Sequence, residues 1–323
     1  MSRLALALIS LCMLGAANGS LAQTGPYPDR PVRIVVAFAP GGIADITVRL
    51  VADKLTGILG KQVVVENLPG AGGIAAAQSV MRAKPDGHSL LLITNGTAIS
   101  KSLFKALPFD PVKDFVPVAF LAHFDVVILT KGDARFRDLG ELLAAAKAQP
   151  GKLNFGTINP GSTQNLSAEL FRSTAGIATT IVPFRTSPEA STALMAGDID
   201  VTFEAYAAVR ALVESGKLKA LASTGSKRSE YLPNVPTPKE AGLVSYEVIA
   251  WNAIAAPTGT PSEIIALLNR HLNTIMVMPD IKKRFLDFGT EAYAGTAEEV
   301  QTRLVNDVAK WGAVIKQANI AQQ

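Results

Sequence analysis

Short apolar runs rich in β-branched residues alternate along this chain with longer stretches that carry apolar residues at helical spacing. The run "VRIVVAF" (32–38) precedes a helical pattern over 43–59, and the runs "QVVVEN" (62–67) and "HSLLLIT" (88–94) continue the alternation. Strands that alternate with helical stretches are typical of βαβ units with parallel strands. The pattern therefore predicts an α/β protein.

The same alternation begins again after residue 131, which indicates a second αβ unit. Its predicted strands are "LNFGT" (153–157), "TTIVPF" (179–184), "DIDVTF" (198–203) and "LKALAST" (218–224). Helices are expected over 139–148, from the segment 158–165 through Phe171 and near 188–196, and three more helices follow the long strand at 246–257.

Two long apolar segments, near 124–130 and 246–256, connect the two units. Two units joined twice in this way predict two lobes with a double-strand hinge and a ligand cleft between them. We expect the first lobe to comprise residues 23–127 and 250–323, and the second lobe to comprise residues 128–249. The chain has 323 residues, which is long enough for two cores.

The first 22 residues have the pattern of a secretory signal peptide. Arg3 makes the start basic, Leu4 to Leu14 are apolar, and Ser20-Leu21-Ala22 forms a cleavage site with small residues at both ends. The apolar run is too short to span a bilayer, which takes about 20 residues. We expect residues 1–22 to be cleaved after Ala22 and the protein to reach the periplasm.

The composition excludes several kinds of chemistry. The only cysteine, Cys12, leaves with the signal peptide, and the large Leu11 before it disfavours lipidation. His88, His123 and His271 stand in unrelated settings without metal-ligand spacing. A formal net charge of +4 suits an anionic small ligand but predicts no nucleic acid. We therefore expect no metal and no other cofactor.

The segment "FAPGGIAD" (38–45) joins a predicted strand to a predicted helix through Pro-Gly-Gly. Free N–H groups and the dipole make a helix N-terminus an anion site. Gly41 and Gly42 would let a ligand approach the backbone, and Asp45 would lie at the cap or in the first turn. A tight turn capped by Asp45 explains the same sequence equally well.

The segment "INPGSTQN" (158–165) repeats this arrangement in the second unit. Ser162 and Thr163 would place hydroxyl groups beside free backbone amides, although an ordinary capped helix has the same pattern. Two such segments in two lobes favour binding, because each can hold one end of a ligand.

Other motifs point away from nucleotides and catalysis. The segment Gly70-x-Gly72-x-x-Ala75 matches part of a dinucleotide fingerprint, but the next strand ends in Ile93, Thr94 and Asn95 rather than in an acidic residue. The sequence has neither a P-loop nor a Gly-x-Ser-x-Gly elbow, and nothing pairs a nucleophile with a base.

Six segments occur in an order that resembles one family. They are "YPDRPVRIVVAFAPGGIAD", "VVVENLPGAGG", "PDGHSLLL", "LPFDPVKDFVPV", "PGKLNFGTINPGSTQNLSAELF" and "VPFRTSPEASTALMAGDIDVTFEA". Together they resemble the solute receptors of tripartite tricarboxylate transporters, the Bug proteins. The resemblance implies a type II periplasmic binding protein fold, with two mixed α/β domains joined by a double-strand hinge.

The resemblance also implies a receptor that captures a small carboxylate in the cleft and delivers it to a membrane permease. The ligand would be an organic acid, a dicarboxylate or an amino acid. The implied ligand-binding residues are Phe38, Pro40, Gly41, Gly42 and Asp45 in the first motif, Thr157, Gly161, Ser162 and Thr163 in the second, and Phe184 and Glu204 farther along.

Three positions depart from the family pattern. Thr186 stands where a glycine is usual, Asn165 where a histidine is common and Glu204 where an aspartate is common, so the ligand cannot be copied from a relative. The alternatives are an exported hydrolase acting on an organic acid and a receptor that presents its ligand to a sensor protein. We expect a monomer without catalytic activity.

Overall fold

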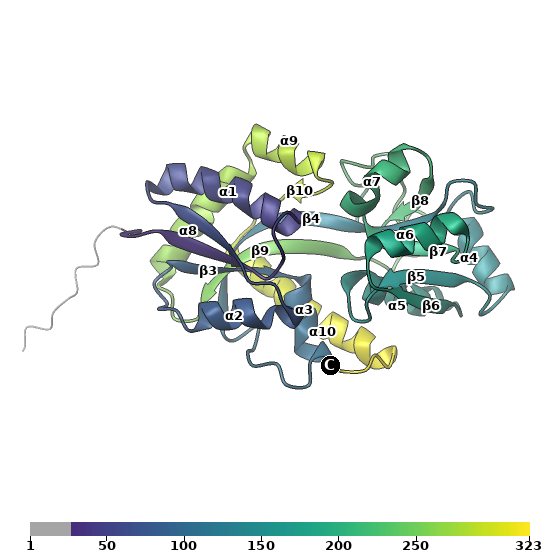
Figure 1. Ribbon diagram of the computed structural model, residues 1–323, viewed down its shortest axis with the longest axis horizontal. Helices are drawn as coiled ribbons and strands as arrows, with labels where there is room; N and C mark the ends of the chain where they lie inside the picture. Colours follow the sequence, from purple (N-terminus) through teal and green to yellow (C-terminus); the bar gives the residue numbers. More distant parts are fainter. Residues whose placement is uncertain (1–26) are drawn as a thin grey trace, which may run out of the picture.

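The computed structural model describes residues 27–323, so the predicted signal peptide lies outside the described residues. The chain forms two lobes side by side along the long axis of the molecule (Figure 1). The sheet of the first lobe has the strand order β2 (Val63–Asn67), β1 (Val32–Val36), β3 (Ser89–Thr94), β9 (Ile249–Pro257) and β4 (Phe115–Lys131), with β10 (Glu291–Ala292) also on β4.

The sheet of the second lobe continues from the far half of β4. The strand order there is β4, β7 (Val201–Ala205), β5 (Asn154–Ile158) and β6 (Thr180–Phe184), and β8 (Leu218–Ser223) also pairs with β4. Strands β1, β2 and β3 are parallel, as are β5, β6 and β7, whereas the neighbours of β4 run antiparallel to it. The predicted mixed α/β architecture is confirmed.

The two strands expected at 116–122 and 124–130 are a single 17-residue strand, β4. It pairs with β9 from Phe115 to Asp125 and with β7 and β8 from Val126 onward, so it crosses from one lobe to the other without a break. The second crossing runs from β8 to β9, where the Thr224 hydroxyl donates to the Val248 carbonyl at 2.6 Å. The hinge therefore has two strands, while the domain boundaries at 127/128 and 249/250 stay a prediction.

Helices cover both sheets, and two of them were not predicted. The first lobe has α1 (Ile43–Leu59), α2 (Ile74–Met81), α3 (Asn95–Leu103), α8 (Ser262–Met276), α9 (Pro279–Asp287) and α10 (Ala297–Gln317). The second lobe has α4 (Leu139–Ala148), α5 (Thr163–Ala175), α6 (Ser187–Ala196) and α7 (Tyr206–Glu214). The unexpected α3 and α7 have nine residues each and follow β3 and β7 without a linker.

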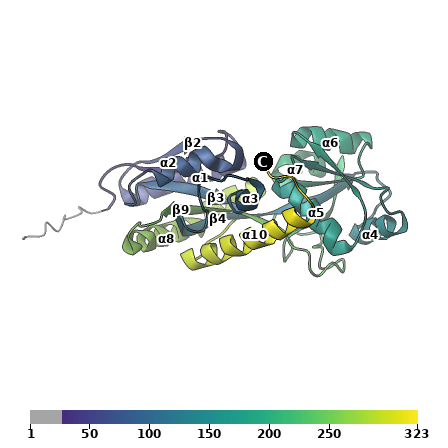
Figure 2. The same ribbon diagram turned by 90° about the horizontal axis from the view of Figure 1, so that it is seen from below.

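The C-terminal helix α10 packs along the first lobe and reaches α5 of the second lobe (Figure 2). Its buried face carries Val300, Leu304, Trp311 and Ile315, as its spacing predicts. The buried Trp251 indole also donates to Asp307 on α10 at 2.7 Å, which fixes the helix against β9. Within residues 27–323, no helix is both long and apolar enough to cross a membrane.

Candidate ligand-binding cleft

A cleft of about 830 Å³ lies between the lobes and takes its lining from both of them. Its floor is formed by strand residues at alternating positions, whose side chains share one face of the sheet. These are Leu92 and Thr94 of β3, Phe124 and Val126 of β4, and Ala250 and Asn252 of β9. The cleft thus sits above the point where β4 and β9 connect the lobes.

The N-termini of five helices meet at this cleft. The lining includes residues at or just before the first turns of α1 (Gly42, Ile43, Ala44), α2 (Gly73), α3 (Asn95, Gly96), α5 (Ser162, Thr163) and α7 (Ala205). No Asp, Glu, Lys or Arg is among the described residues that line it. Helix N-termini carry partial positive charge and free N–H groups. The cleft is therefore suited to an anion held by backbone amides rather than by a cationic side chain.

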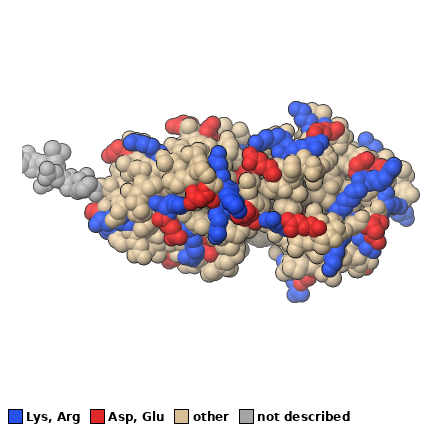
Figure 3. All heavy atoms as spheres, turned by 90° about the horizontal axis from the view of Figure 1, so that it is seen from above, with Lys and Arg blue, Asp and Glu red and all other residues tan. Residues whose placement is uncertain are grey.

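The outer surface adds no large field of one sign on the face drawn in Figure 3. Basic and acidic side chains are interspersed there over both lobes. Steering of an anion toward the cleft over a long range would need a basic patch. This face therefore has no patch of one sign that would steer an anion over a long range.

The first Pro-Gly loop (Phe38–Asp45) ends at the N-terminus of α1. Gly41 has φ +86°, and its N–H donates to the Asp45 carboxylate at 2.9 Å. Gly42 is the N-cap residue of α1 and supplies no side-chain cap. Because no side chain caps the first turn, the amides of Ile43 and Ala44 are open to a ligand.

Asp45 supports this loop from behind. Its carboxylate is 3% exposed and also accepts from Arg49 Nε at 3.0 Å and from Asn67 Nδ2 at 2.9 Å. Burial alone would raise its pKa, but the hydrogen bonds from Arg49, the Gly41 amide and Asn67 outweigh burial and hold the pKa below its usual value. Phe38 and Gly42 line the cleft, whereas Pro40, Gly41 and Asp45 do not.

The second Pro-Gly loop (Ile158–Asn165) has the same backbone plan at the N-terminus of α5. Gly161 has φ +80°, and its N–H donates to Asn165 Oδ1 at 3.0 Å. The Ser162 hydroxyl caps the helix by accepting from the Asn165 N–H at 3.1 Å. The fully buried Thr157 accepts from Asn165 Nδ2 at 3.2 Å. Gly161, Ser162 and Thr163 line the cleft, and Thr157 lies behind the loop.

The two lobes touch each other inside the cleft. The side-chain amide of Asn95, at the start of α3, donates to the hydroxyl of Thr163, at the start of α5. Leu103 of α3 lies against Gly161, so that a Cβ added to Gly161 would come within 2.7 Å of Leu103 Cδ1. The second Pro-Gly loop is therefore the part of the second lobe that contacts the first lobe inside the cleft.

Glu204 and Phe184 lie beside the cleft rather than in its lining. Glu204 is 1% exposed, and its Oε1 accepts from Gln164 Nε2 at 2.7 Å and from the Ala205 N–H at 2.8 Å. Gln164 itself lines the cleft, so Glu204 orients a lining residue. Phe184 packs against the second-lobe core, and Thr186 caps α6 with its hydroxyl.

Several lining residues were not predicted as part of a site. The segment Gly70–Gly73, which resembled a nucleotide fingerprint, lines the cleft at the start of α2, as do Asn95 and Asn252. The Thr94 and Thr97 hydroxyls form a capping box, a local signal that could have revealed α3. For Asn252 the signal was one amide residue in an apolar strand.

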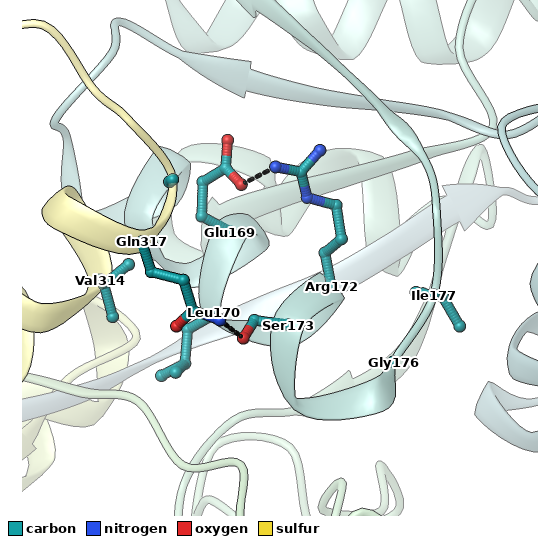
Figure 4. A pocket seen from close by; sticks show the side chains of 9 residues that line it. Glu169, Leu170, Arg172, Ser173, Gly176, Ile177, Val314 and Gln317 are labelled. Carbon is teal, nitrogen blue, oxygen red and sulfur yellow. Dashed lines mark hydrogen bonds and ion pairs between the residues drawn. The ribbon is translucent and has the colours of Figure 1, made fainter.

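A smaller pocket of about 280 Å³ lies between α5 and α10 (Figure 4). It holds the Glu169–Arg172 ion pair, at 2.6 Å, and the hydrogen bond from Gln317 Nε2 to Ser173 Oγ, at 2.7 Å. The pocket lies at the C-terminal end of α5, where the helix dipole is negative. Its basic group is already paired, so this pocket is a poor anion site.

The fold and the cleft define a two-lobed receptor for a small solute, and comparison with known proteins identifies the family. Residues 47–320 match the family model described as the tripartite tricarboxylate transporter family receptor. The chain belongs to this family, as its ordered motifs predicted. The residues described hold no cluster of three or more side chains able to bind a metal ion.

Relatives match over nearly the whole chain. Protein BugT of Bordetella pertussis is 32% identical over 319 residues, which cover 98% of each chain. A solved structure of R. palustris Rpa4515 with adipate has a TM-score of 0.77 at 31% identity and covers 91% of this chain and 99% of that one. MatC from Rhodopseudomonas palustris, with bound malate, has a TM-score of 0.73 at 32% identity and covers 90% and 100% of the two chains. The predicted periplasmic binding protein fold is confirmed.

Proposed function

We propose that this protein captures a small carboxylate in the cleft between its lobes, in the periplasm, and delivers it to the permease of a tripartite tricarboxylate transporter. The observation that carries the proposal is the meeting of five helix N-termini at a cleft without charged side chains. An anion is the ligand that such a site stabilises best. The relatives solved with adipate and malate support a carboxylate.

The first Pro-Gly loop would hold one carboxylate group. The N–H groups of Ile43 and Ala44 and the approach across Gly42 allow charge-assisted hydrogen bonds, which are worth roughly 1.5–3 kcal/mol each. A cleft of about 830 Å³ is larger than a small acid needs, so ordered water would fill the remaining space and bridge some contacts.

The second Pro-Gly loop would complete the site when the lobes approach. The hydrogen bond between Asn95 and Thr163 and the contact between Leu103 and Gly161 join the lobes in the cleft. A ligand that bridges both lobes adds to these contacts and favours the closed form. The closed, loaded form would then be the one that the permease recognises.

Thermal shift and titration calorimetry with a panel of organic acids test this proposal. At 100 times its Kd, a bound acid stabilises the fold by about 2.7 kcal/mol, which raises Tm by several degrees in a protein of this size. The matched amides, such as succinamide for succinate, should give no shift. A panel of C3 to C8 acids without any shift would contradict the proposal.

The exported hydrolase and the sensor receptor make different predictions. Incubation with stoichiometric protein should return the acid unchanged, and chemical conversion of the acid would favour the hydrolase. Deletion of the cognate permease should abolish uptake of the bound acid by cells. Retained uptake with loss of a transcriptional response would favour the sensor receptor.

A further inference from the structure

Asn252 is a polar residue in the middle of an apolar strand. Strand β9 has the sequence "IAWNAIAAP", and Asn252 is 3% exposed. Its side chain lies on the face of β9 that Ala250 presents to the cleft, while Trp251 points the other way, to Asp307. In the sheet it stands beside Thr94 of β3 and Ala122 of β4. Asn252 is therefore part of the floor between the two Pro-Gly loops.

The amide of Asn252 makes no side-chain hydrogen bond with any residue of the range 27–323. No hydrogen bond joins it to the neighbouring Thr94 hydroxyl, which accepts from the Gly96 N–H at 3.0 Å, and Ala122 has no polar side chain. The amide atoms open onto the cleft, where a ligand can reach them. An apolar residue would suit the apolar neighbours in β9 better, so an amide at this position is expected to find its partner in a ligand.

We propose that Asn252 determines specificity by hydrogen bonding to a hydroxyl group on the carbon chain of the carboxylate ligand. The inference rests on the proposed function and assigns the ligand to the hydroxy acids. Asn252 lies on the floor of the cleft, between the helix N-termini that would hold the carboxylate groups at either end. A substituent on the chain, rather than a terminal group, is therefore what its amide would meet.

A hydroxyl is the substituent that fits this amide best. A hydroxyl donates to Oδ1 and accepts from Nδ2, so it satisfies both sides of the Asn252 amide. An oxo group only accepts and leaves Oδ1 without a donor. An ammonium group only donates, and it would bring positive charge to a cleft whose helix N-termini are already positive. A plain methylene chain satisfies neither atom.

Three pairs of acids that differ by one hydroxyl test this inference with the mature chain in titration calorimetry: succinate and malate, glutarate and 2-hydroxyglutarate, and adipate and 3-hydroxyadipate. In the wild type, the hydroxy acid of the best-fitting length should bind about tenfold tighter, which corresponds to about 1.4 kcal/mol, because its hydroxyl pairs with the Asn252 amide. In Asn252→Ala that ratio should fall to about one, while the unsubstituted acid binds as well as before.

Two further variants complete the test. Asn252→Val, with a β-branched residue suited to a strand, gives a second measurement if Asn252→Ala folds poorly. Asn306→Ala is the matched control, because Asn306 is an exposed asparagine on α10 outside the lining of the cleft, and it should leave the hydroxyl preference unchanged.

The outcomes separate this inference from the proposed function. Equal binding of both acids in all three pairs by the wild type would mean that the Asn252 amide meets only water, and it would overturn the inference. A hydroxyl preference that persists in both Asn252 variants would also overturn it. If no acid of any pair binds, thermal shift with the wider panel of organic acids decides between the two cases. A shift with another acid overturns only the inference, and no shift with any acid overturns the proposed function as well.

Discussion

The two Pro-Gly loops share one backbone plan in two different lobes. In each loop a glycine with positive φ follows a proline, and the next residue is the N-cap of a helix. In each loop the side chain four residues after the glycine folds back to the glycine N–H, Asp45 to Gly41 at 2.9 Å and Asn165 to Gly161 at 3.0 Å. This hydrogen bond sets the angle at which each strand turns into its helix.

The loops differ in what surrounds that shared backbone. The first Pro-Gly loop is capped by Gly42 without a side chain, and a Cβ on Gly41 would meet open space. The second is capped by Ser162, and its buried Gly161 is pressed against Leu103 of the other lobe. The first loop is thus open to a ligand, whereas the second satisfies more of its own amides and contacts the opposite lobe. The same turn serves as an anion site in one lobe and as a closing surface in the other.

The largest expected effect separates the two glycines. Both Gly41→Ala and Gly161→Ala put a Cβ at positive φ, which costs roughly 1–3 kcal/mol of stability. Only Gly161→Ala adds overpacking against Leu103, about 1–3 kcal/mol, so its ligand affinity should fall roughly 5- to 150-fold further than that of Gly41→Ala. Calorimetry and X-ray scattering should show weaker binding and a larger radius of gyration for Gly161→Ala, and Leu103→Ala should restore part of the affinity. Equal affinities for the two variants would remove the distinction between the loops.

The second comparison uses pH. Asp45→Ala and Asn165→Ala should each cost about 1–3 kcal/mol at pH 7, because each leaves a glycine amide without its acceptor. The pKa of Asp45 is lowered in the fold, so its contribution is present above about pH 4, the unfolded value, and is lost as the pH falls through the folded pKa. The Tm difference for Asp45→Ala should therefore shrink toward pH 3, whereas that for Asn165→Ala should stay constant. Parallel pH profiles would show that the Asp45 charge is unimportant.

The third prediction concerns access to the first Pro-Gly loop. Gly42 has φ −78°, an extended conformation that valine also adopts, and a Cβ there would meet only Ala39 O, at 3.8 Å. It would, however, crowd the amides that a carboxylate must approach to about 3 Å. Gly42→Val should weaken binding about tenfold or more through the loss of one charge-assisted hydrogen bond, and it should lower Tm modestly because valine is a poorer N-cap than glycine. Gly57→Ala, on the exposed side of α1, is the control for folding. Unchanged affinity in Gly42→Val would mean that Pro-Gly-Gly is only a turn.

The smallest effects come from exchanging the caps. Gly42→Ser should stabilise α1 by a few tenths of a kcal/mol, since serine caps slightly better than glycine, but its hydroxyl would compete with the ligand and weaken binding a few-fold. Ser162→Gly should lose a similar amount of stability and leave affinity nearly unchanged. Denaturant unfolding and calorimetry on both variants measure this. If Ser162→Gly weakens binding as much as Gly42→Ser, the second loop holds an anion as directly as the first.

Local sequence determined most of the secondary structure and the two-lobed plan. Apolar periodicity indicated the strands and the longer helices, because side-chain burial on one face follows the repeat of the element itself. Helix α4, for instance, spans Leu139–Ala148 as predicted. The short helices α3 and α7 escaped because each begins directly after a strand, where nine residues offer little periodic signal.

The two Pro-Gly motifs were also visible in the sequence, because glycine, proline and capping residues act on their nearest neighbours in the chain. The sequence did not show, however, which side chains line the cleft and which only support the loops. Asp45 and Thr157 support the loops from behind, and Glu204 orients Gln164 instead of lining the cleft. Only tertiary structure decided this, because a side chain's direction depends on what packs around it.

Which residues line the cleft depended most of all on the tertiary structure. Gly73, Asn95 and Asn252 come from segments far apart in the chain, and only the order of β1, β3 and β9 in the sheet brings them together. By itself the sequence determined where the chain turns, which faces are apolar and which helix starts carry free amides, since these follow from local sterics and burial. Packing across the lobes decided the rest: which helix starts meet, which of them stays open, and which amide lies unpaired between them. The physical reason is that these contacts join residues that no local pattern in the sequence links.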